Sequence, residues 1–509
     1  MKNSKTGKAG IGFWTVTSLI FLLDVVLIVA INYLQTEFIV SFNQIYATLL
    51  LPMEGADTGF IGEAVLDNAW KTIYFLLPAC FFILIDLVVL RKINGLFEIT
   101  LGKRIKRISY RKLFHTGTFT SVTALLLAIL LSFEHSYNVI NFFKTKNERS
   151  TIYEEYYIDP NSVNVTAGEN AKNVIYIYVE SLETTYASES VGGNQPVNNY
   201  IPNLTEIARE NISFSNSDKL GGFQAFSSTS YTFGALIGST FGFPLSAESI
   251  GIDYSNSKIL PEAVNFGDVL EKNGYNQEFL CGSDASFAGR DNLFKSHGNH
   301  KIFDYFTAIE KGYIDKDYKV WWGFEDTKLF EIAKDEITAL AAEEKPFNFT
   351  MLTVDTHHID GYVCQLCENT YPDQLANVIA CTDRQMNEFI NWIKEQDFYE
   401  DTLVVIVGDH PRMDSSLVNH VAYENRMVYN CFINSDKSPA GATVNRKFAI
   451  IDMFPTVLSA MGFEIEGDRL GLGTDMFSGK PTILETMGSQ KFSDEISKRS
   501  DYYEKHFNN

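Results

Sequence analysis

Residues 402–410 read TLVVIVGDH, and this stretch decides the fold. Five consecutive strand formers, Leu403 to Val407, end at a glycine, which is typical of a strand buried on both faces of a parallel sheet. In such sheets the ligand site lies beyond the carboxyl ends of the strands. Asp409 and His410 stand at that end, and a carboxylate beside an imidazole is a natural pair of ligands for a divalent metal. An aspartate that caps a turn beside a solvated histidine explains the dipeptide equally well, so the rest of the chain has to decide.

Strand and helix patterns alternate on either side of this stretch. Further strand-like runs lie at 173–179, 276–281, 347–354 and 428–434, and helical patterns fill 201–209, 259–273, 324–344, 374–396 and 448–462. This alternation predicts one large α/β domain over residues 173–480, with a mostly parallel sheet and helices on both faces. A polar linker at 135–172 precedes the domain, and a C-terminal helical tail at 481–509 follows it.

The first 134 residues predict a membrane domain with three transmembrane helices. Apolar stretches at 11–33, 72–90 and 113–133 are each about long enough to cross a bilayer. Asp24 and Asp86 interrupt the first two, so these helices are expected to face each other there rather than lipid. The loop 91–112 carries eight basic residues against one acid, Glu98. The positive-inside rule then places this loop in the cytoplasm and everything after about residue 134 outside the cell membrane.

Charge excludes one class of partner. The chain of 509 residues has a net charge of −21, and the part after residue 134 holds about 30 basic and 54 acidic residues. So acidic a domain argues against nucleic acid as a partner.

Polar residues gather just after separate strands of the predicted sheet. Glu180 follows the first strand, His357 and His358 follow the run at 347–354, and Asp409-His410 follow the last. Each of these residues alone is explained as a capping residue. Three strand ends that supply oxygen and nitrogen ligands together indicate a metal site.

A hydroxyl-rich segment, GGFQAFSSTSYTFGALIGSTFGFPL at 221–245, leads into an apolar helical pattern. Metal coordination and a helix N-terminus would activate a threonine hydroxyl such as that of Thr229. Ser227, Ser228, Thr229 or Ser230 can each instead be a plain helix cap. Arg290, in SFAGRDNLFKSHG, can clamp a phosphate, although a lone arginine more often forms a surface ion pair.

These segments together resemble a known family. IYVESLE, SSTSYTFGALIGSTFGFPL, SFAGRDNLFKSHG, WGFEDTKLF, LTVDTHHIDGY and VVIVGDH occur in the order found in phosphoglycerol transferases of the sulfatase/alkaline-phosphatase superfamily. The likeness is greatest to those that modify osmoregulated periplasmic glucans, and lipoteichoic acid synthases are more distant. It runs from about residue 173 to 475 and implies an alkaline-phosphatase-like fold.

The resemblance also implies roles for individual residues. The metal ligands fall on Glu180, Thr229, Asp409 and His410, with Thr229 as the nucleophile in preference to Thr232. Substrate binding falls on Arg290, Asp284, His357 and His358, with His357 also catalytic, although Ile359 stands where the family has proline. The implied metal is Mn²⁺, with Mg²⁺ or Zn²⁺ as alternatives.

The activity implied is transfer of phosphoglycerol from phosphatidylglycerol, a membrane lipid, to a glycan or glycolipid of the cell envelope through a phosphothreonine-type intermediate. A phosphoethanolamine transferase or a hydrolase on the same fold is the enzymatic alternative. A catalytically inactive envelope-binding protein is the alternative from another class, and a retained nucleophile argues against it.

Cysteines indicate a covalent crosslink. Cys364-Gln-Leu-Cys367 can be a redox or zinc pair, but no second CxxC completes a zinc site. Outside the cytoplasm, a disulfide from this pair to Cys381 is the more natural interpretation. The resemblance implies that the bond joins Cys367 to Cys381 and leaves Cys364 as an extra thiol.

Overall fold

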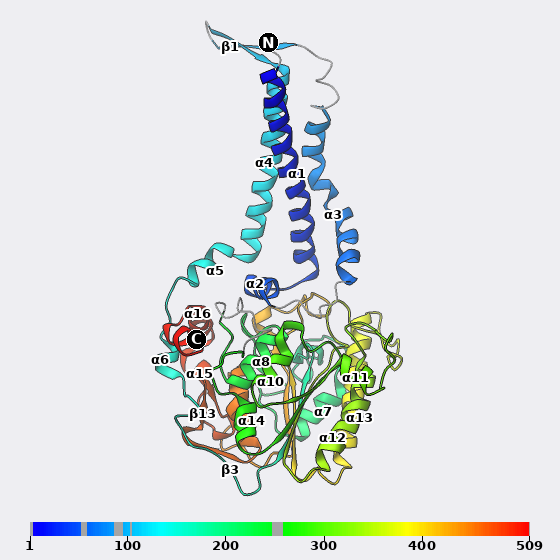
Figure 1. The fold of residues 1–509 in the computed structure, drawn as a ribbon, viewed down its shortest axis with the longest axis vertical. Helices are drawn as coiled ribbons and strands as arrows, with labels where there is room; N and C mark the ends of the chain where they lie inside the picture. The colour runs from blue at the N-terminus through cyan, green and yellow to red at the C-terminus, as the bar shows by residue number, and fades with distance from the viewer. Residues whose placement is uncertain (1–3, 52–58, 86–94, 102–103, 247–257, 508–509) are drawn as a thin grey trace. The chain divides into compact units, whose positions relative to one another are not determined.

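The computed structural model describes residues 4–51, 59–85, 95–101, 104–246 and 258–507 (Figure 1). Its internal contacts divide the chain into two compact units. The first unit comprises residues 1–39 and 58–141, and the second comprises residues 40–57 and 142–509.

Three long helices make up most of the first unit. Helices α1 (Ser4–Glu37), α3 (Gly59–Leu84) and α4 (Tyr110–Tyr137) pack against one another, and strands β1 (Leu96–Leu101) and β2 (Arg104–Ser109) form a hairpin before α4. Among the described residues, Phe13–Glu37 and Lys112–Tyr137 are long and apolar enough to cross a membrane.

The second predicted span is shorter within the described residues. Its apolar helical part is Thr72–Leu84, and residues 86–94, with Asp86, lie outside the described residues. Asp24 is fully buried, as expected of an acid that faces neighbouring helices rather than lipid.

The second unit is built on a six-stranded sheet in the order β11-β9-β4-β8-β6-β7. Five strands are parallel: β4 (Asn173–Val179), β6 (Asn276–Cys281), β7 (Lys301–Phe303), β8 (Phe347–Leu352) and β9 (Thr402–Gly408). Strand β11 (Asn430–Ile433) is antiparallel at one edge. The predicted α/β class with a mostly parallel sheet is confirmed.

Strand β4 lies at the centre because its side chains are apolar on both faces. Val174, Tyr176 and Tyr178 belong to one apolar cluster with α8 (Thr232–Phe241) and α14 (Met453–Ala460). Ile175 and Ile177, which point the other way, are fully buried too. Helices α12 (Asp326–Ala341) and α13 (Gln374–Lys394) pack together on the other side of the sheet (Figure 1).

Local sequence explains where two further helices of the second unit begin. Helix α7 begins at Pro202, as predicted, and α9 begins at Phe266 because Asn265 and Asp268 form a capping box there. The other helices and strands are α2 (Phe42–Leu50), α5 (Val139–Thr145), α6 (Ile152–Tyr156), β3 (Val165–Ala167), α7 (Pro202–Glu210), β5 (Phe223–Gln224), α9 (Phe266–Lys272), α10 (Arg290–Ser296), α11 (Tyr305–Glu310), β10 (Met427–Val428), β12 (Phe463–Ile465), β13 (Arg469–Leu470) and β14 (Gly473–Thr474).

The last residues are part of the core of the second unit. They form α15 (Ile483–Met487), α16 (Ser489–Ser497) and α17 (Asp501–Phe507). Phe507 stacks on Phe243 with ring centroids 4.7 Å apart, and Tyr503 packs against Tyr153 of α6. The segments predicted as a linker and a tail therefore pack against each other.

Candidate metal centre and nucleophile

Three predicted metal ligands meet at the carboxyl ends of two neighbouring strands. Glu180 follows β4, and Asp409 and His410 follow β9. One ligand atom from each residue lies within 4.8 Å of the others, and all three side chains are buried. The register of the parallel sheet produces this arrangement, since Val179 pairs with Gly408.

The hydrogen bonds of these side chains leave the lone pairs of Asp409 Oδ2 and His410 Nε2 facing the centre of the cluster. Asp409 Oδ1 accepts the backbone N–H groups of Ser181 and His410, both at 2.8 Å, whereas its buried Oδ2 has no donor among the described residues. His410 Nδ1 donates to the carbonyl of Pro411 at 2.9 Å, so its Nε2 is unprotonated in the neutral ring. That nitrogen lies 3.3 Å from Asp409 Oδ2.

The two carboxylates and the imidazole perturb one another strongly. Burial, together with the charge of Glu180, raises the pKa of Asp409 to about 7. Burial alone would raise the pKa of Glu180, but His410 and His357 outweigh it and hold that pKa below its usual value. Burial would lower the pKa of His410, but Asp409 and Glu180 raise it.

These residues fit a divalent cation. Two buried carboxylates side by side are unfavourable unless a positive charge joins them, and an orphan carboxylate oxygen needs a partner. Oxygen and imidazole ligands suit Mn²⁺, Mg²⁺ or Zn²⁺. The backbone carbonyl that fixes the tautomer of His410 is a typical outer contact of a metal-binding histidine.

The hydroxyl beside this cluster belongs to Thr232. Its Oγ1 lies 3.3 Å from His410 Nε2 and 3.4 Å from Glu180 Oε2. Thr229 is the predicted nucleophile and fourth ligand, but its hydroxyl is hydrogen-bonded within its own turn. Its Oγ1 accepts from the backbone N–H of Phe226 and donates to the carbonyl of Phe226, both at 3.3 Å. Of the two threonines, it is therefore Thr232 whose hydroxyl contacts Glu180 and His410 in the structure.

The physical reason is the position of the helix start. The sequence predicts that Thr229 lies at the helix N-terminus. Helix α8 begins only at Thr232, because residues before it form a turn in which Thr229 N–H donates to the carbonyl of Phe226 at 2.8 Å. The N–H groups of the first helical turn, which have no partner within a helix, therefore belong to the segment beginning at Thr232.

Aromatic contacts join His357 and His358 to Trp322 and Phe287. His357 and His358 follow β8, and their ring centroids are 3.9 Å apart. His357 packs edge-on against Trp322 at 4.8 Å, and Trp322 packs against Phe287 at 5.4 Å. Burial lowers the pKa of His357 despite the opposing effect of Glu180, so its ring is neutral at neutral pH.

Arg290 is held within its own loop. The guanidinium donates to the carbonyls of Phe287 and Asp284 at 3.0 and 2.7 Å and to Ser283 Oγ at 3.1 Å. The Asp284 carboxylate accepts the backbone N–H of Ser286 at 2.8 Å. Arg290 is buried and lies 5.4 Å from the ring of Phe287. The structure thus places both residues just beyond the carboxyl end of β6, and it records no contact between either of them and Glu180, Asp409 or His410 among the described residues.

Sequence reasoning missed a buried ionic support beneath the site. Glu183 forms a two-point ion pair with Arg426, at 2.9 and 2.5 Å, and both side chains are buried. Arg412, equally buried, pairs with Asp414 and donates to the carbonyl of Thr356 at 2.7 Å. Thr356 in turn donates to the carbonyl of Glu180 at 2.5 Å. The sequence does give one indication of these pairs. Glu183 comes three residues after Glu180, and Arg412 comes two residues after His410, both of which are predicted metal ligands.

The three cysteines form one cluster. Cys364 Sγ lies 3.5 Å from Cys367 Sγ and 3.7 Å from Cys381 Sγ, and all three are free thiols in the structure. Gln385 Nε2 donates to Cys381 Sγ at 3.4 Å. Cys364, which the resemblance left over, therefore contacts both members of the predicted Cys367–Cys381 pair.

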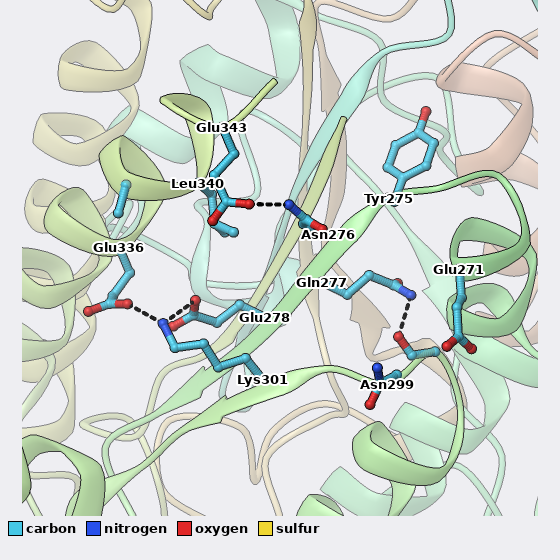
Figure 2. Close-up of a pocket in the computed structure, with 12 residues that line it drawn as sticks. Glu271, Tyr275, Asn276, Gln277, Glu278, Asn299, Lys301, Glu336, Leu340 and Glu343 are labelled. Atoms are coloured by element: carbon cyan, nitrogen blue, oxygen red, sulfur yellow. Dashed lines mark hydrogen bonds and ion pairs between the residues drawn. The ribbon is translucent and has the colours of Figure 1, made fainter. Parts of the chain in front are cut away.

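A separate pocket of about 310 Å³ lies towards the amino-terminal half of β6 (Figure 2). Lys301 bridges Glu278 and Glu336 there, at 3.0 and 2.7 Å, and Asn276 contacts Glu343. Ligand sites of parallel sheets lie at the other ends of the strands, where Glu180, Asp409 and His410 meet. This pocket is thus not the candidate active site.

The sequence matches the model of a known protein family over the residues that build this site. The model of the sulfatase family covers residues 172–463, which contain the whole six-stranded sheet and all three cluster ligands. This chain belongs to the sulfatase family. The match agrees with the range of the resemblance found in the sequence.

Curated proteins and solved structures show further similarity. The chain is 31% identical over 316 residues to phosphoglycerol transferase I of Salmonella choleraesuis (strain SC-B67), covering 60% of this chain and 39% of that protein. It is 31% identical over 336 residues to phosphoglycerol transferase I of Escherichia coli (strain SMS-3-5 / SECEC), covering 64% and 41%. The matched part thus spans about two fifths of the length of these relatives.

Among solved structures, lipoteichoic acid synthase LtaP from Listeria monocytogenes aligns with a TM-score of 0.47 at 20% identity, covering 62% of this chain and 79% of that one. The integral membrane lipooligosaccharide phosphoethanolamine transferase A from Neisseria meningitidis aligns with a TM-score of 0.49 at 14% identity, covering 88% and 84%.

Proposed function

We propose that this protein is a membrane-anchored, metal-dependent phosphoglycerol transferase. The observation that carries the proposal is the Thr232 hydroxyl at a helix start, beside Glu180 and His410. A hydroxyl in that position suits a nucleophile, and a protein that only binds its ligand has no need of one. The names of the curated relatives support phosphoglycerol as the transferred group.

The metal would be held by Glu180, Asp409, His410 and the Thr232 hydroxyl, and Mn²⁺ is the ion we propose. When bound, it supplies Lewis-acid polarisation of the phosphoryl group and lowers the pKa of the threonine hydroxyl. The N–H groups at the start of α8 favour the negative charge of the phosphate. Thr232 Oγ1 attacks phosphorus, the bond to diacylglycerol breaks, and phosphoglycerol remains on Thr232.

His357 is the proposed proton carrier of the second half-reaction. Its Nδ1 donates to the carbonyl of His358 at 2.7 Å, so the lone pair of its Nε2 is available. A neutral imidazole can accept the proton of an acceptor hydroxyl as that hydroxyl attacks phosphorus. We place Arg290, Asp284 and His358 on the substrate side of the site, where Arg290 would hold the phosphate or glycerol group.

The proposed donor is phosphatidylglycerol and the proposed acceptor is a glycan or glycolipid of the cell envelope. A membrane lipid as donor agrees with two helices able to cross a membrane. We propose three spans in all, with the 91–112 loop in the cytoplasm and the second unit outside, as the basic residues of that loop indicate.

Headgroup-labelled phosphatidylglycerol tests the activity. Membranes containing the wild-type protein should release diacylglycerol and move the label to envelope glycan. Thr232→Ala should reduce diacylglycerol release by at least about 10³-fold, since it removes the nucleophile. Thr229→Ala is the matched control and should retain most activity. Transfer from labelled phosphatidylethanolamine instead would replace this proposal with a phosphoethanolamine transferase, and label appearing as free glycerophosphate would indicate a hydrolase.

A further inference from the structure

Helix α2 (Phe42–Leu50) is bound to the second unit through one face. Gln44 and Ala47 are buried, as is Leu51 just after the helix, and the two apolar side chains belong to the core cluster of that unit. Gln44 Nε2 donates to the carbonyl of Ser230 at 2.7 Å. Ser230 lies two residues before Thr232, so α2 packs directly against the segment that presents the proposed nucleophile (Figure 1).

The opposite face of α2 is apolar as well. At 100° per residue, Phe42, Tyr46, Leu49 and Leu50 lie together on the side away from Gln44 and Ala47. Leu49 is 75% exposed and Leu50 is 40% exposed. A surface helix of a protein in water carries polar residues on its outer face. An exposed apolar face of this kind indicates that something apolar covers it.

Aromatic rings and a lysine border this face. Phe42 packs against Phe142 with ring centroids 5.0 Å apart, and Tyr46 packs against Phe142 at 5.4 Å. Lys146 Nζ lies 4.4 Å from the centre of the Tyr46 ring, and Phe143 is 48% exposed. A tyrosine ring such as that of Tyr46, with a lysine beside it, is characteristic of the level of lipid headgroups, where the cation meets phosphate.

Along the sequence, both parts of this surface follow shortly after candidate membrane spans. Phe42 comes a few residues after Glu37, where the span Phe13–Glu37 ends, and Phe142 comes a few residues after Tyr137, where the span Lys112–Tyr137 ends. A helix so close in sequence to two span ends can reach the membrane surface. The lipid bilayer is therefore the occupant that the chain itself brings to this face.

We propose that Phe42, Tyr46, Leu49, Leu50, Phe143 and Lys146, here called the α2 face, form a lipid-contact surface that receives the acyl chains of the donor lipid. This inference rests on the proposed function. In the transfer step the Thr232 Oγ–phosphorus bond forms, the phosphorus–oxygen bond to diacylglycerol breaks, and diacylglycerol leaves with the proton of the threonine hydroxyl. Both the donor and this leaving group are apolar, and the α2 face gives them a path from the bilayer.

The test compares a lipid with long acyl chains and one with short chains. Full-length protein in nanodiscs is assayed for diacylglycerol release from dioleoyl-phosphatidylglycerol and from water-soluble dihexanoyl-phosphatidylglycerol. The double variant L49S/L50S should lower kcat/KM for the long-chain lipid by about tenfold or more, since it removes two apolar contacts. It should change kcat/KM for the short-chain lipid by less than about twofold, which corresponds to less than about 0.5 kcal/mol. Leu49→Phe keeps the face apolar and should behave as wild type.

Val444→Ser is the matched control, because Val444 is 40% exposed on a different surface segment of the same unit. Equal losses with both lipids, or no loss with either, would overturn the proposal. Absence of activity with both lipids in the wild type would overturn the proposed function instead, and the two failures are thereby distinguished.

A second measurement does not depend on turnover. Phosphatidylglycerol with a photoactivatable group at the end of one acyl chain is crosslinked to the full-length protein, and the modified peptides are mapped. Crosslinks within 42–50 or 142–146 support the α2 face as the lipid contact. Crosslinks confined to other segments, or a dimer that L49S/L50S dissociates, would show that another surface receives the lipid or that a second copy covers this one.

Discussion

At the scale of single residues, the chemistry depends on four polar atoms that the fold brings together. Glu180, Asp409, His410 and Thr232 are separated by up to about 230 positions in the chain, yet their side chains are in contact. Burial makes each charge costly unless a partner compensates for it. The orphan Oδ2 of Asp409 is the clearest sign that the compensating partner is a cation.

The pKa of Asp409 gives this site a pH dependence. Since that pKa is raised to about 7, protons compete with a cation for the carboxylate below this value. Mn²⁺ affinity of the purified protein should therefore fall on going from about pH 8 to about pH 6, by up to about tenfold per unit below the pKa. Titration calorimetry at both pH values measures it. Asp409→Asn should bind weakly at both, and an affinity of the wild type that does not change with pH would contradict the assignment.

The position of a site residue in the chain decides whether the sequence alone can reveal it. Glu180, Asp409 and His410 directly follow buried strands, so the pattern of apolar residues predicts their position. The choice between Thr229 and Thr232 depends on where α8 begins, and the turn around Phe226 decides that through contacts no local pattern specifies. Trp322 could not be placed against His357 without knowing how distant loops meet.

At the level of elements, hydrogen bonds and an ion pair made by two buried arginines tie three strand ends together. Arg412, after β9, holds the carbonyl of Thr356 after β8, and Arg426 holds Glu183 after β4. The sequence shows the arginines and the acidic residues, but it does not show which of them form buried ion pairs. The strands themselves were predictable because long β-branched runs are informative, whereas the short strand β7 carries too little pattern to be recognised.

Removing one partner of the buried pair should destabilise the second unit. Arg426→Ala leaves the Glu183 carboxylate buried without its cation, which costs about 3–5 kcal/mol in free energy of unfolding. Denaturant unfolding followed by tryptophan fluorescence measures the change. Arg209→Ala removes an exposed pair with Glu206, which solvent screens, and should leave the same free energy nearly unchanged. Equal changes in the free energy of unfolding in the two variants would show that burial of the Glu183–Arg426 pair does not increase the cost of breaking it.

The cysteine cluster ties the loop after β8 to helix α13. We expect a disulfide between Cys367 and Cys381, which would close a loop of about 15 residues and stabilise the fold by roughly 3 kcal/mol on the chain-entropy model. Peptide mapping without reduction tests it. Three free thiols would refute the crosslink, and a bond from Cys364 to Cys381, whose sulfurs lie 3.7 Å apart, would show that Cys364 is the true partner.

At the scale of the whole molecule, the account requires the second unit to face the outside of the cell. The basic loop at 91–112 and the two candidate spans motivate this topology. Protease added to intact cells or protoplasts should therefore cut within residues 142–509 and leave the first unit attached to the membrane. Complete protection of residues 142–509, with cleavage only after lysis, would place the catalytic unit on the wrong side for an envelope acceptor.

The most direct test of the central claim is to find the intermediate on its residue. Full-length protein is loaded with Mn²⁺, incubated with phosphatidylglycerol without acceptor, quenched in acid, digested and analysed by mass spectrometry. We expect a phosphoglycerol group on Thr232, absent from Thr232→Ala and unchanged in Thr229→Ala. A phosphoglycerol group on Thr229, or label transfer that proceeds with no modified threonine, would contradict it.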